Sequence, residues 1–235
     1  MAIRALVFDV FGTVVDWRSS VIRQCEEFGA RHGVKLDWGA FVDDWRYDGY
    51  IGGSILIRKG ELPMMTTDQL HRRKLDMLLA QHGLERVDET ERDRLNRAWH
   101  RLDPWPDSVE GLRRLRTRYI VSTLSNGNVS LLVDMAKHAG LTWDCVLSAD
   151  LIGAYKPDPR MYEGACRFLD LTAEEVLMVA AHKNDLRAAQ KCGLQAAFVP
   201  RPAEAGPSRS PDLDFDPAFQ YNATSFEELA AQMGC

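Results

Sequence analysis

The sequence has few features that would tie the protein to a membrane, to nucleic acid or to an oxidising compartment. Its five cysteines are odd in number and form no C-x-x-C pair, which argues against a disulfide framework or a thiolate metal site. No apolar run reaches the roughly 18 residues of a membrane span, and no secretory signal stands out. A net charge of −5 argues against nucleic acid or a membrane surface as a partner. We therefore expect a cytoplasmic protein.

What the sequence does contain is a series of short apolar runs, which are continuous rather than alternating. Such runs are typical of strands that are buried on both faces. The clear runs are residues 3–8, 119–125, 176–181 and 194–200, with a weaker one at 143–149. Helical patterns lie between or beside them at residues 108–117, 129–138, 159–169 and 185–192. This alternation predicts an α/β fold with a parallel sheet and right-handed crossovers.

One long stretch does not follow this alternation. Residues 16–98 show helical periodicity throughout and contain no convincing buried strand. They predict an all-helical insertion after the first strand, with residues 51–63 as a connection interrupted by glycine and proline. Residues 200–218 are rich in Pro, Ser and Asp and predict a surface loop.

Several polar residues follow the predicted strands, at the edge where open parallel sheets place their functional groups. They are Asp9, Ser125 with Asn126, Lys156, and Asp185. Taken singly, each has a structural explanation, such as a turn, an exposed loop lysine or a helix cap. Taken together, they predict that two carboxylates, a hydroxyl, an amide and an ammonium group meet in one site.

The order and spacing of these residues resemble the haloacid dehalogenase superfamily. The resemblance is carried by the first motif, Asp9-x-x-Gly12-Thr13, by Ser125-Asn126, by Lys156-Pro157-Asp158 and by Asp185. It covers essentially the whole chain. It implies an enzyme with a Rossmann-like catalytic core (residues 1–15 and 99–235) and a helical cap domain (residues 16–98). It also implies that Asp9 is a nucleophile that forms a covalent intermediate.

The sequence lacks a second acid two residues after Asp9, and this absence bears on the reaction. Magnesium-dependent phosphatases of the superfamily carry an aspartate there to protonate the leaving group, whereas this chain has Phe11. Residues 180–182 also bring no acid to help hold a hard cation. A halide leaving group needs no proton. We therefore expect a hydrolytic dehalogenase without metal or cofactor, and keep a magnesium-dependent phosphatase of a small phosphorylated metabolite as the alternative.

The chain is similar in particular to the 2-haloacid dehalogenase branch, whose first motif has an aromatic residue at the position of Phe11. That resemblance implies that Arg46 and Asn126 receive the halide and that Ser125 grips the substrate carboxylate. Thr13 is expected to orient Asp9, and the charge of Lys156 to keep Asp9 ionised. The segment from Tyr155 to Tyr162 matches the lysine segment of the branch, so Tyr162 is placed in the substrate site.

The last motif departs from the branch, which typically has Ser-x-Asn-x-x-Asp where this chain has Ala180-Ala181-His182-Lys183-Asn184-Asp185. Asp185 still matches. His182 replaces the asparagine and is a candidate general base, since imidazole titrates near neutral pH. Asn184 replaces an aromatic residue, which predicts a changed pocket. The resemblance favours the L form of a short 2-haloacid as the substrate, and a homodimer is possible because the branch often forms one.

Overall fold

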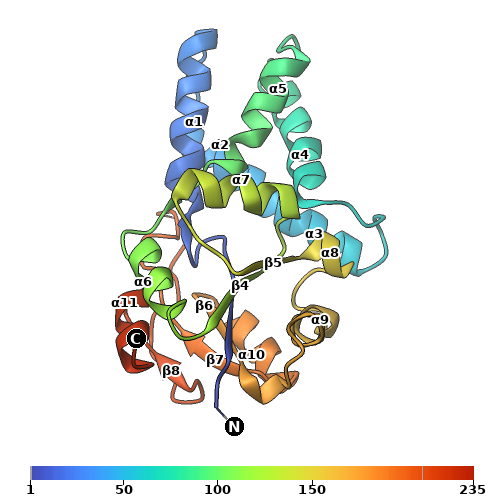
Figure 1. The fold of residues 1–235 in the computed structure, drawn as a ribbon. Coiled ribbons are helices and arrows are strands. Elements are labelled where there is room, and N and C mark those ends of the chain that lie inside the picture. Colours follow the sequence, from blue (N-terminus) through green and yellow to red (C-terminus); the bar gives the residue numbers. More distant parts are fainter. Residues whose placement is uncertain (1, 208) are drawn as a thin grey trace.

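A six-stranded sheet forms the centre of the protein in the computed structural model, which describes residues 2–207 and 209–235 (Figure 1). Its strand order is β5-β4-β1-β6-β7-β8, and every neighbouring pair is parallel. The strands are β1 (Ala5–Phe8), β4 (Ile120–Ser125), β5 (Cys145–Ser148), β6 (Val176–Ala180), β7 (Gln195–Phe198) and β8 (Tyr221–Asn222). The predicted α/β fold class is confirmed. The five longer strands lie within the five apolar runs, whereas the two-residue β8 was not predicted.

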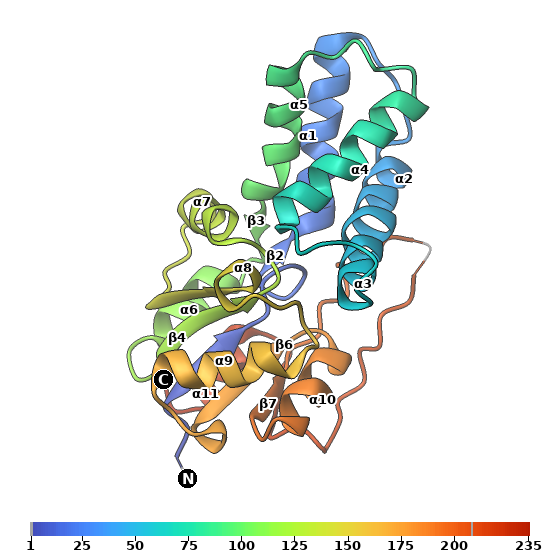
Figure 2. The same ribbon diagram turned by 90° about the vertical axis from the view of Figure 1, so that its right-hand side faces the viewer.

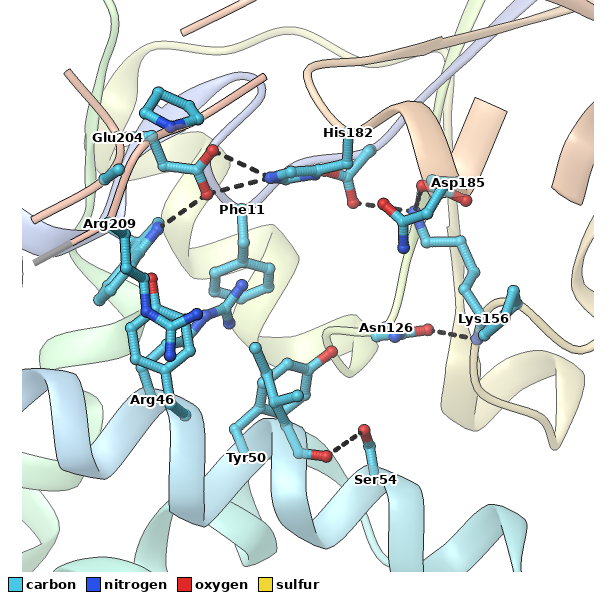
Figure 3. A pocket seen from close by; sticks show the side chains of 18 of the residues that line it. Phe11, Arg46, Tyr50, Ser54, Asn126, Lys156, His182, Asp185, Glu204 and Arg209 are labelled. Carbon is cyan, nitrogen blue, oxygen red and sulfur yellow. Dashed lines mark hydrogen bonds and ion pairs between the residues drawn. The ribbon is translucent and has the colours of Figure 1, made fainter. Parts of the chain in front are cut away.

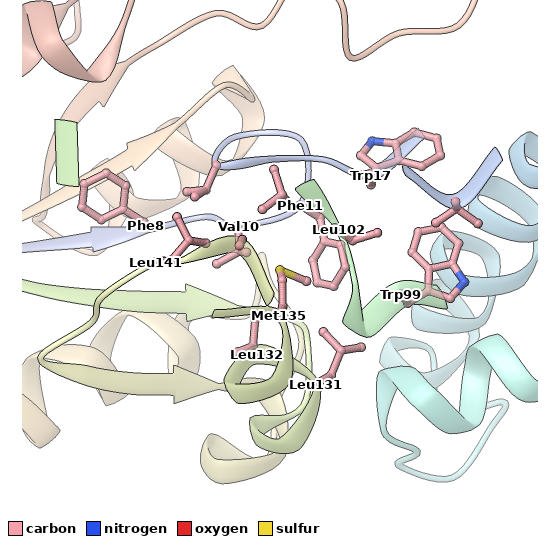
Figure 4. Close-up of a cluster of buried hydrophobic side chains, with 14 of the residues drawn as sticks. Phe8, Val10, Phe11, Trp17, Trp99, Leu102, Leu131, Leu132, Met135 and Leu141 are labelled. Atoms are coloured by element: carbon pink, nitrogen blue, oxygen red, sulfur yellow. The ribbon is translucent and has the colours of Figure 1, made fainter. Parts of the chain in front are cut away.

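The apolar runs are continuous because helices cover both faces of the sheet. In β1, Leu6 and Phe8 belong to one buried cluster, whereas Val7 belongs to another. The first cluster contains side chains of α6 (Ser108–Leu115), α7 (Val129–Ala139) and α11 (Phe226–Gln232). The second contains side chains of α9 (Pro159–Leu169) and α10 (Lys183–Lys191). Figure 4 shows part of the first cluster, which continues from Phe8 to Phe11 and Trp99.

The long insertion is helical, as predicted, and rises above the sheet (Figure 2). Its elements are α1 (Trp17–His32), α2 (Trp38–Asp44), the π-helix η1 (Trp45–Ile51), α3 (Gly52–Arg58), α4 (Thr67–Gln81), α5 (Glu89–Asn96) and the 3₁₀-helix η2 (Arg97–His100). A two-residue antiparallel ladder, β2 (Val15–Asp16) with β3 (Asp103–Pro104), joins its two ends. No helix in the described ranges is long and apolar enough to cross a membrane.

The prediction of an irregular connection over residues 51–63 was wrong for its first half. Gly52 to Arg58 form helix α3, which continues directly from η1. Gly53 is needed for close packing rather than for a turn, because a Cβ at this position would lie 2.7 Å from Leu70 Cδ2. Helix α3 thereby stays packed against α4 and turns Ser54 toward the cavity described below.

The segment between β7 and β8 is largely exposed, as expected of a surface loop. In Figure 2 this segment extends from the sheet toward α2 and α3 of the insertion. Arg209 of this segment places its guanidinium 3.5 Å from the centre of the Tyr47 ring in η1. The loop that joins β7 to β8 therefore also contacts the helical insertion.

A buried histidine lies at the junction of the insertion and the core. His100, only 3% exposed, has no partner that the sequence suggests. In the structure its Nδ1 lies 2.9 Å from Asp134 of α7 and its Nε2 lies 3.0 Å from Asp68 of α4. Burial by itself lowers the pKa of His100, but these carboxylates outweigh it and raise the pKa above its ordinary value.

Because its pKa is raised in the folded protein, His100 should make stability depend on pH. Its contribution is complete below the ordinary histidine value of about 6.5 and is lost as pH rises through the raised value. We expect the free energy of unfolding to fall over that range in urea titrations. His100→Gln should remove this component and lower stability by about 1–3 kcal/mol. Identical pH profiles for the two proteins would contradict the assignment.

Candidate active site

Asp9 lies directly after β1, at the carboxyl end of the sheet, and its side chain is held by three groups. Its carboxylate accepts a hydrogen bond from Thr13 Oγ1 (2.7 Å) on Oδ2 and one from Lys156 Nζ (2.8 Å) on Oδ1. His182 Nδ1 lies 3.1 Å from Oδ2. The strand order places β4 and β6 on the two sides of β1, so Asp9 lies at the crevice where open α/β sheets bind ligands.

Lys156 is held between two carboxylates in a nearly dry environment. Its side chain is 7% exposed, and Nζ donates to both Asp9 and Asp185. Asp185, in the first turn of α10, also accepts a 2.5 Å hydrogen bond from the hydroxyl of Tyr162 in α9. The structure therefore brings Asp9, Lys156 and Asp185 together, as predicted from their order along the sheet edge. Tyr162 contacts Asp185 and does not line the cavity.

These contacts set the charges at the site. Burial by itself would raise the pKa of Asp9, but the positive charges of Lys156 and His182 outweigh it and hold the pKa well below its usual range. For Lys156, burial lowers the pKa, whereas Asp185 and Asp9 together raise it above its ordinary value. Asp9 is therefore an anion, and Lys156 a cation, throughout the neutral pH range.

His182 contacts a carboxylate through each of its ring nitrogens; Figure 3 shows the contact of the ring with Glu204. Besides Nδ1 on Asp9, its Nε2 lies 2.9 Å from Glu204 Oε2 and 3.1 Å from Oε1. Burial alone would lower the pKa of His182, but the two carboxylates raise it to about 10. In the free protein His182 is therefore an imidazolium that donates to both neighbours.

Glu204 is the residue of this site that sequence reasoning missed. It lies in the loop after β7, among residues predicted only to form a surface loop. Its side chain is 17% exposed and also accepts a 3.1 Å hydrogen bond from Trp17 Nε1. The carboxylate lies against Gly12, which has a φ of +83°. The glycine of the first motif thus gives both the backbone conformation and the space that Glu204 needs.

Gly12→Ala should therefore disturb the site as well as the fold. The added Cβ would overlap the Glu204 carboxylate, and alanine disfavours a positive φ. We expect a loss of about 1–3 kcal/mol in the free energy of unfolding and a displaced loop. Gly140→Ala is the matched control, since Gly140 has a φ of +66° but nothing within 4 Å of the added Cβ. Equal pH profiles and activities in both variants would count against a specific clash with Glu204.

Arg46, in the π-helix η1, is a buried cation without a carboxylate partner among the described residues. It is 7% exposed, and its Nη1 has no hydrogen-bond partner there. Aromatic rings surround its guanidinium, with ring centres 4.6–5.9 Å away: Tyr50, Phe11, Trp17 and Trp99. Cation–π contacts offset part of its desolvation. The site thus has an unneutralised positive charge in an apolar surrounding, suited to a small anion.

These groups line a cavity of about 460 Å³. Asp9, Phe11, Arg46, Asn126, Lys156, His182, Asn184, Asp185 and Glu204 all contribute to its wall. Asn126 also accepts a 2.7 Å hydrogen bond from the backbone N–H of Lys156, which fixes the lysine loop. Ser125 is fully buried, accepts from the Gly127 N–H, and is not among the cavity-lining residues. Tyr47 and Arg209 also line the cavity.

The site offers no cluster of side chains that would suit a metal ion among the described residues. Within residues 2–207 and 209–235 no three His, Cys, Asp or Glu side chains are arranged to hold an ion. The acidic groups of the site are instead paired: Asp9 and Asp185 with Lys156, and Glu204 with His182.

The chain is similar over nearly its whole length to proteins of known activity. The (S)-2-haloacid dehalogenase 4A of Burkholderia cepacia is 33% identical over 232 residues, which are 97% of this chain and 94% of that protein. A crystal structure of an L-2-haloacid dehalogenase superposes with a TM-score of 0.94 at 45% identity, covering 99% of both chains. That of a defluorinating L-2-haloacid dehalogenase gives 0.95 at 44% identity, covering 99% of this chain and 96% of the other.

A family model described as haloacid dehalogenase-like hydrolase matches residues 3–193. The matched range begins just before β1 and ends just after α10, so it contains Asp9, Lys156 and Asp185 as well as the helical insertion. Glu204 lies beyond it. The chain belongs to the haloacid dehalogenase-like hydrolases.

Proposed function

We propose that the protein is a hydrolytic dehalogenase that converts short (S)-2-haloalkanoic acids to 2-hydroxy acids and halide, through an ester on Asp9. The observation that carries the proposal is the juxtaposition of an ionised, buried Asp9 with the unpartnered cation Arg46 across one cavity. Phe11, where a phosphatase needs an acid, lies under the same guanidinium at 5.2 Å. The named dehalogenase relatives support the same reaction.

In the first step Asp9 attacks the 2-carbon of the substrate, and the halide leaves with the bonding electrons. Thr13 and His182 hold Oδ2, whereas Oδ1 accepts from Lys156 alone among the described residues, so Oδ1 keeps more free lone pairs for the attack. The aromatic wall with Phe11 excludes water from the nucleophile, and a less hydrated carboxylate attacks carbon more readily.

The departing halide would be received by Arg46 together with Asn126, both on the cavity wall. Halide needs positive charge but no proton, and Arg46 provides charge that no carboxylate of the described chain neutralises. The substrate carboxylate would be held by the backbone near Phe11, with Asn184 shaping the pocket beside Asp185. Ser125, which does not line the cavity, would contribute by orienting the backbone N–H of Gly127.

In the second step water attacks the Asp9 carbonyl carbon and releases the hydroxy acid. His182, 3.1 Å from Asp9, is the side chain best placed to take a proton from this water. Lys156 would stabilise the charge that develops on the carbonyl oxygen. Tyr162 would act through Asp185, which it contacts, by keeping Asp185 oriented toward Lys156.

The proposal is tested by halide release from (S)-2-chloropropionate and chloroacetate in the presence of EDTA. Because the proposed mechanism gives every catalytic role to a side chain and none to a metal ion, we expect EDTA to leave the activity unchanged. A single turnover in ¹⁸O-water, followed by mass spectrometry of the peptide that contains Asp9, should show the label in that peptide. Activity that is lost with EDTA, or that appears only with phosphate esters and Mg²⁺, would favour the phosphatase alternative.

We also propose that residues 16–98 act as a cap domain on a core of residues 1–15 and 99–235. Arg46 of the insertion and Asp9 of the core line one cavity, which supports this division. A cytoplasmic setting is supported by the five cysteines, all of which are free. A homodimer stays a prediction from the resemblance.

A further inference from the structure

The contacts of His182 raise a problem for the hydrolysis step. A general base must hold a free lone pair, but in the resting site both ring nitrogens face carboxylates, Asp9 and Glu204. An imidazolium between two anions cannot accept a proton. Among the described residues, the charged side chains that contact the ring are Asp9 and Glu204. Lys156 contacts Asp9 through Oδ1, the oxygen that His182 does not contact.

We infer that Glu204 is a positioning residue that keeps a proton on Nε2 of His182, so that formation of the Asp9 ester itself frees Nδ1 to act as the base. The inference rests on the proposed function and deepens it. It assigns a role to a residue of the loop after β7, outside the range that the family model matches.

Ester formation removes the partner of one nitrogen only. When Asp9 bonds to the 2-carbon and the carbon–halogen bond breaks, the halide takes the electron pair and the carboxylate charge disappears. The Nδ1 proton then has no anionic acceptor, and His182 loses one of the two charges that hold its pKa high. This proton leaves to solvent. The Nε2 proton stays, because Glu204 keeps its charge at 2.9 Å.

Hydrolysis then returns the site to its starting state. Water adds to the Asp9 carbonyl carbon and gives a proton to Nδ1. The bond from that carbon to the substrate oxygen breaks, and the hydroxy acid leaves with this proton. The new Asp9 carboxyl group passes its own proton to Nδ1, which restores the ion pair. One proton per turnover has been released, in the ester-forming step, as the overall reaction requires.

The surroundings of Glu204 suit a fixed orienting group rather than a mobile surface charge. It accepts from Trp17 Nε1 at 3.1 Å, and Gly12 leaves room for it directly beside the Asp9 loop. Its two oxygens lie 2.9 and 3.1 Å from Nε2, so the ring cannot flip without losing both contacts. A carboxylate that fixes the histidine tautomer also makes the opposite nitrogen a stronger base.

The test compares the wild type with Glu204→Gln in rapid-quench mass spectrometry of the Asp9 peptide. We expect the ester to form at a rate within about twofold of the wild type and to be hydrolysed about 10- to 100-fold more slowly, so that it accumulates. Without the Glu204 charge the imidazolium is a stronger acid. The pH at which hydrolysis is half-maximal should therefore move down while the plateau falls.

Glu91→Gln is the matched control, since Glu91 also faces a histidine, His32, at 3.3 Å but lies on the surface of the insertion. It should leave both rates unchanged. In the wild type near pH 8, an indicator dye should report proton release together with halide release and before hydrolysis. If Glu204→Gln left the rate and pH profile of ester hydrolysis unchanged, or slowed ester formation and ester hydrolysis equally, the inference would be overturned while the proposed function would stand. A wild type that releases no halide would overturn the proposed function.

Discussion

Replacing Asp9 with asparagine is expected to lower kcat for halide release by about 10⁴-fold or more, the size of loss seen when a nucleophile is removed. The amide oxygen carries no charge and cannot form the ester. Lys156 would keep Asp185 as its partner, and His182 would keep Glu204, so the fold should survive. Halide release measured with an electrode, beside circular dichroism of the same samples, separates lost chemistry from lost structure.

The control for this variant is Asp16→Asn, only seven residues away on the same segment. Asp16 caps helix α1 by accepting from the Ser19 N–H and does not line the cavity. Asparagine caps a helix about as well as aspartate, so this variant should change the free energy of unfolding by no more than about 0.5 kcal/mol and leave kcat unchanged. Retained turnover in Asp9→Asn, with the correct mass at position 9, would refute the ester route altogether.

The chemistry at Asp9 was predictable from the sequence because it depends on strand ends. A continuous apolar run predicts a strand covered on both faces, and the residue after such a strand lies at the functional edge of the sheet. Asp9, Lys156 and Asp185 follow different strands yet meet through direct hydrogen bonds. The helical insertion was predictable for the same reason, since its periodicity departs from that of the core.

Glu204 and the pairing of His100 were not predictable, because their contacts depend on how irregular or distant segments meet. Glu204 lies in a loop with no apolar period, and nothing in its neighbours indicates that it folds back onto Gly12. His100 depends on α4 of the insertion and α7 of the core, whose relative position follows from how the insertion packs on the core. Helix α3 was missed since its glycines resemble turn signals, whereas Gly53 serves close packing with Leu70.

The second large effect is expected at Arg46, where activity and stability should move in opposite directions. Arg46→Met removes the charge that would receive the halide. The methionine side chain is unbranched, long and apolar, so it should fit among the same aromatic rings. We expect kcat/KM for halide release to fall by about 10²- to 10³-fold, mainly through slower ester formation. Arg46→Lys should recover part of the loss, since lysine keeps the charge but not the planar fork.

Stability should nevertheless rise in Arg46→Met. The guanidinium is buried, and Nη1 has no partner within residues 2–207 and 209–235, so the folded protein carries an incompletely compensated charge. Removing it should raise the free energy of unfolding by about 1 kcal/mol, measured by urea titration.

Arg18→Met is the matched control for the stability effect. Arg18 also lies in the insertion but is paired with Asp43 at 2.8 and 2.9 Å. Its loss should lower stability and leave kcat/KM nearly unchanged. If Arg46→Met instead destabilised the protein as Arg18→Met does, Arg46 would be a structural residue with a partner of its own. A gain in stability together with a loss of halide release would identify Arg46 as a charge kept for the substrate, at the expense of the fold.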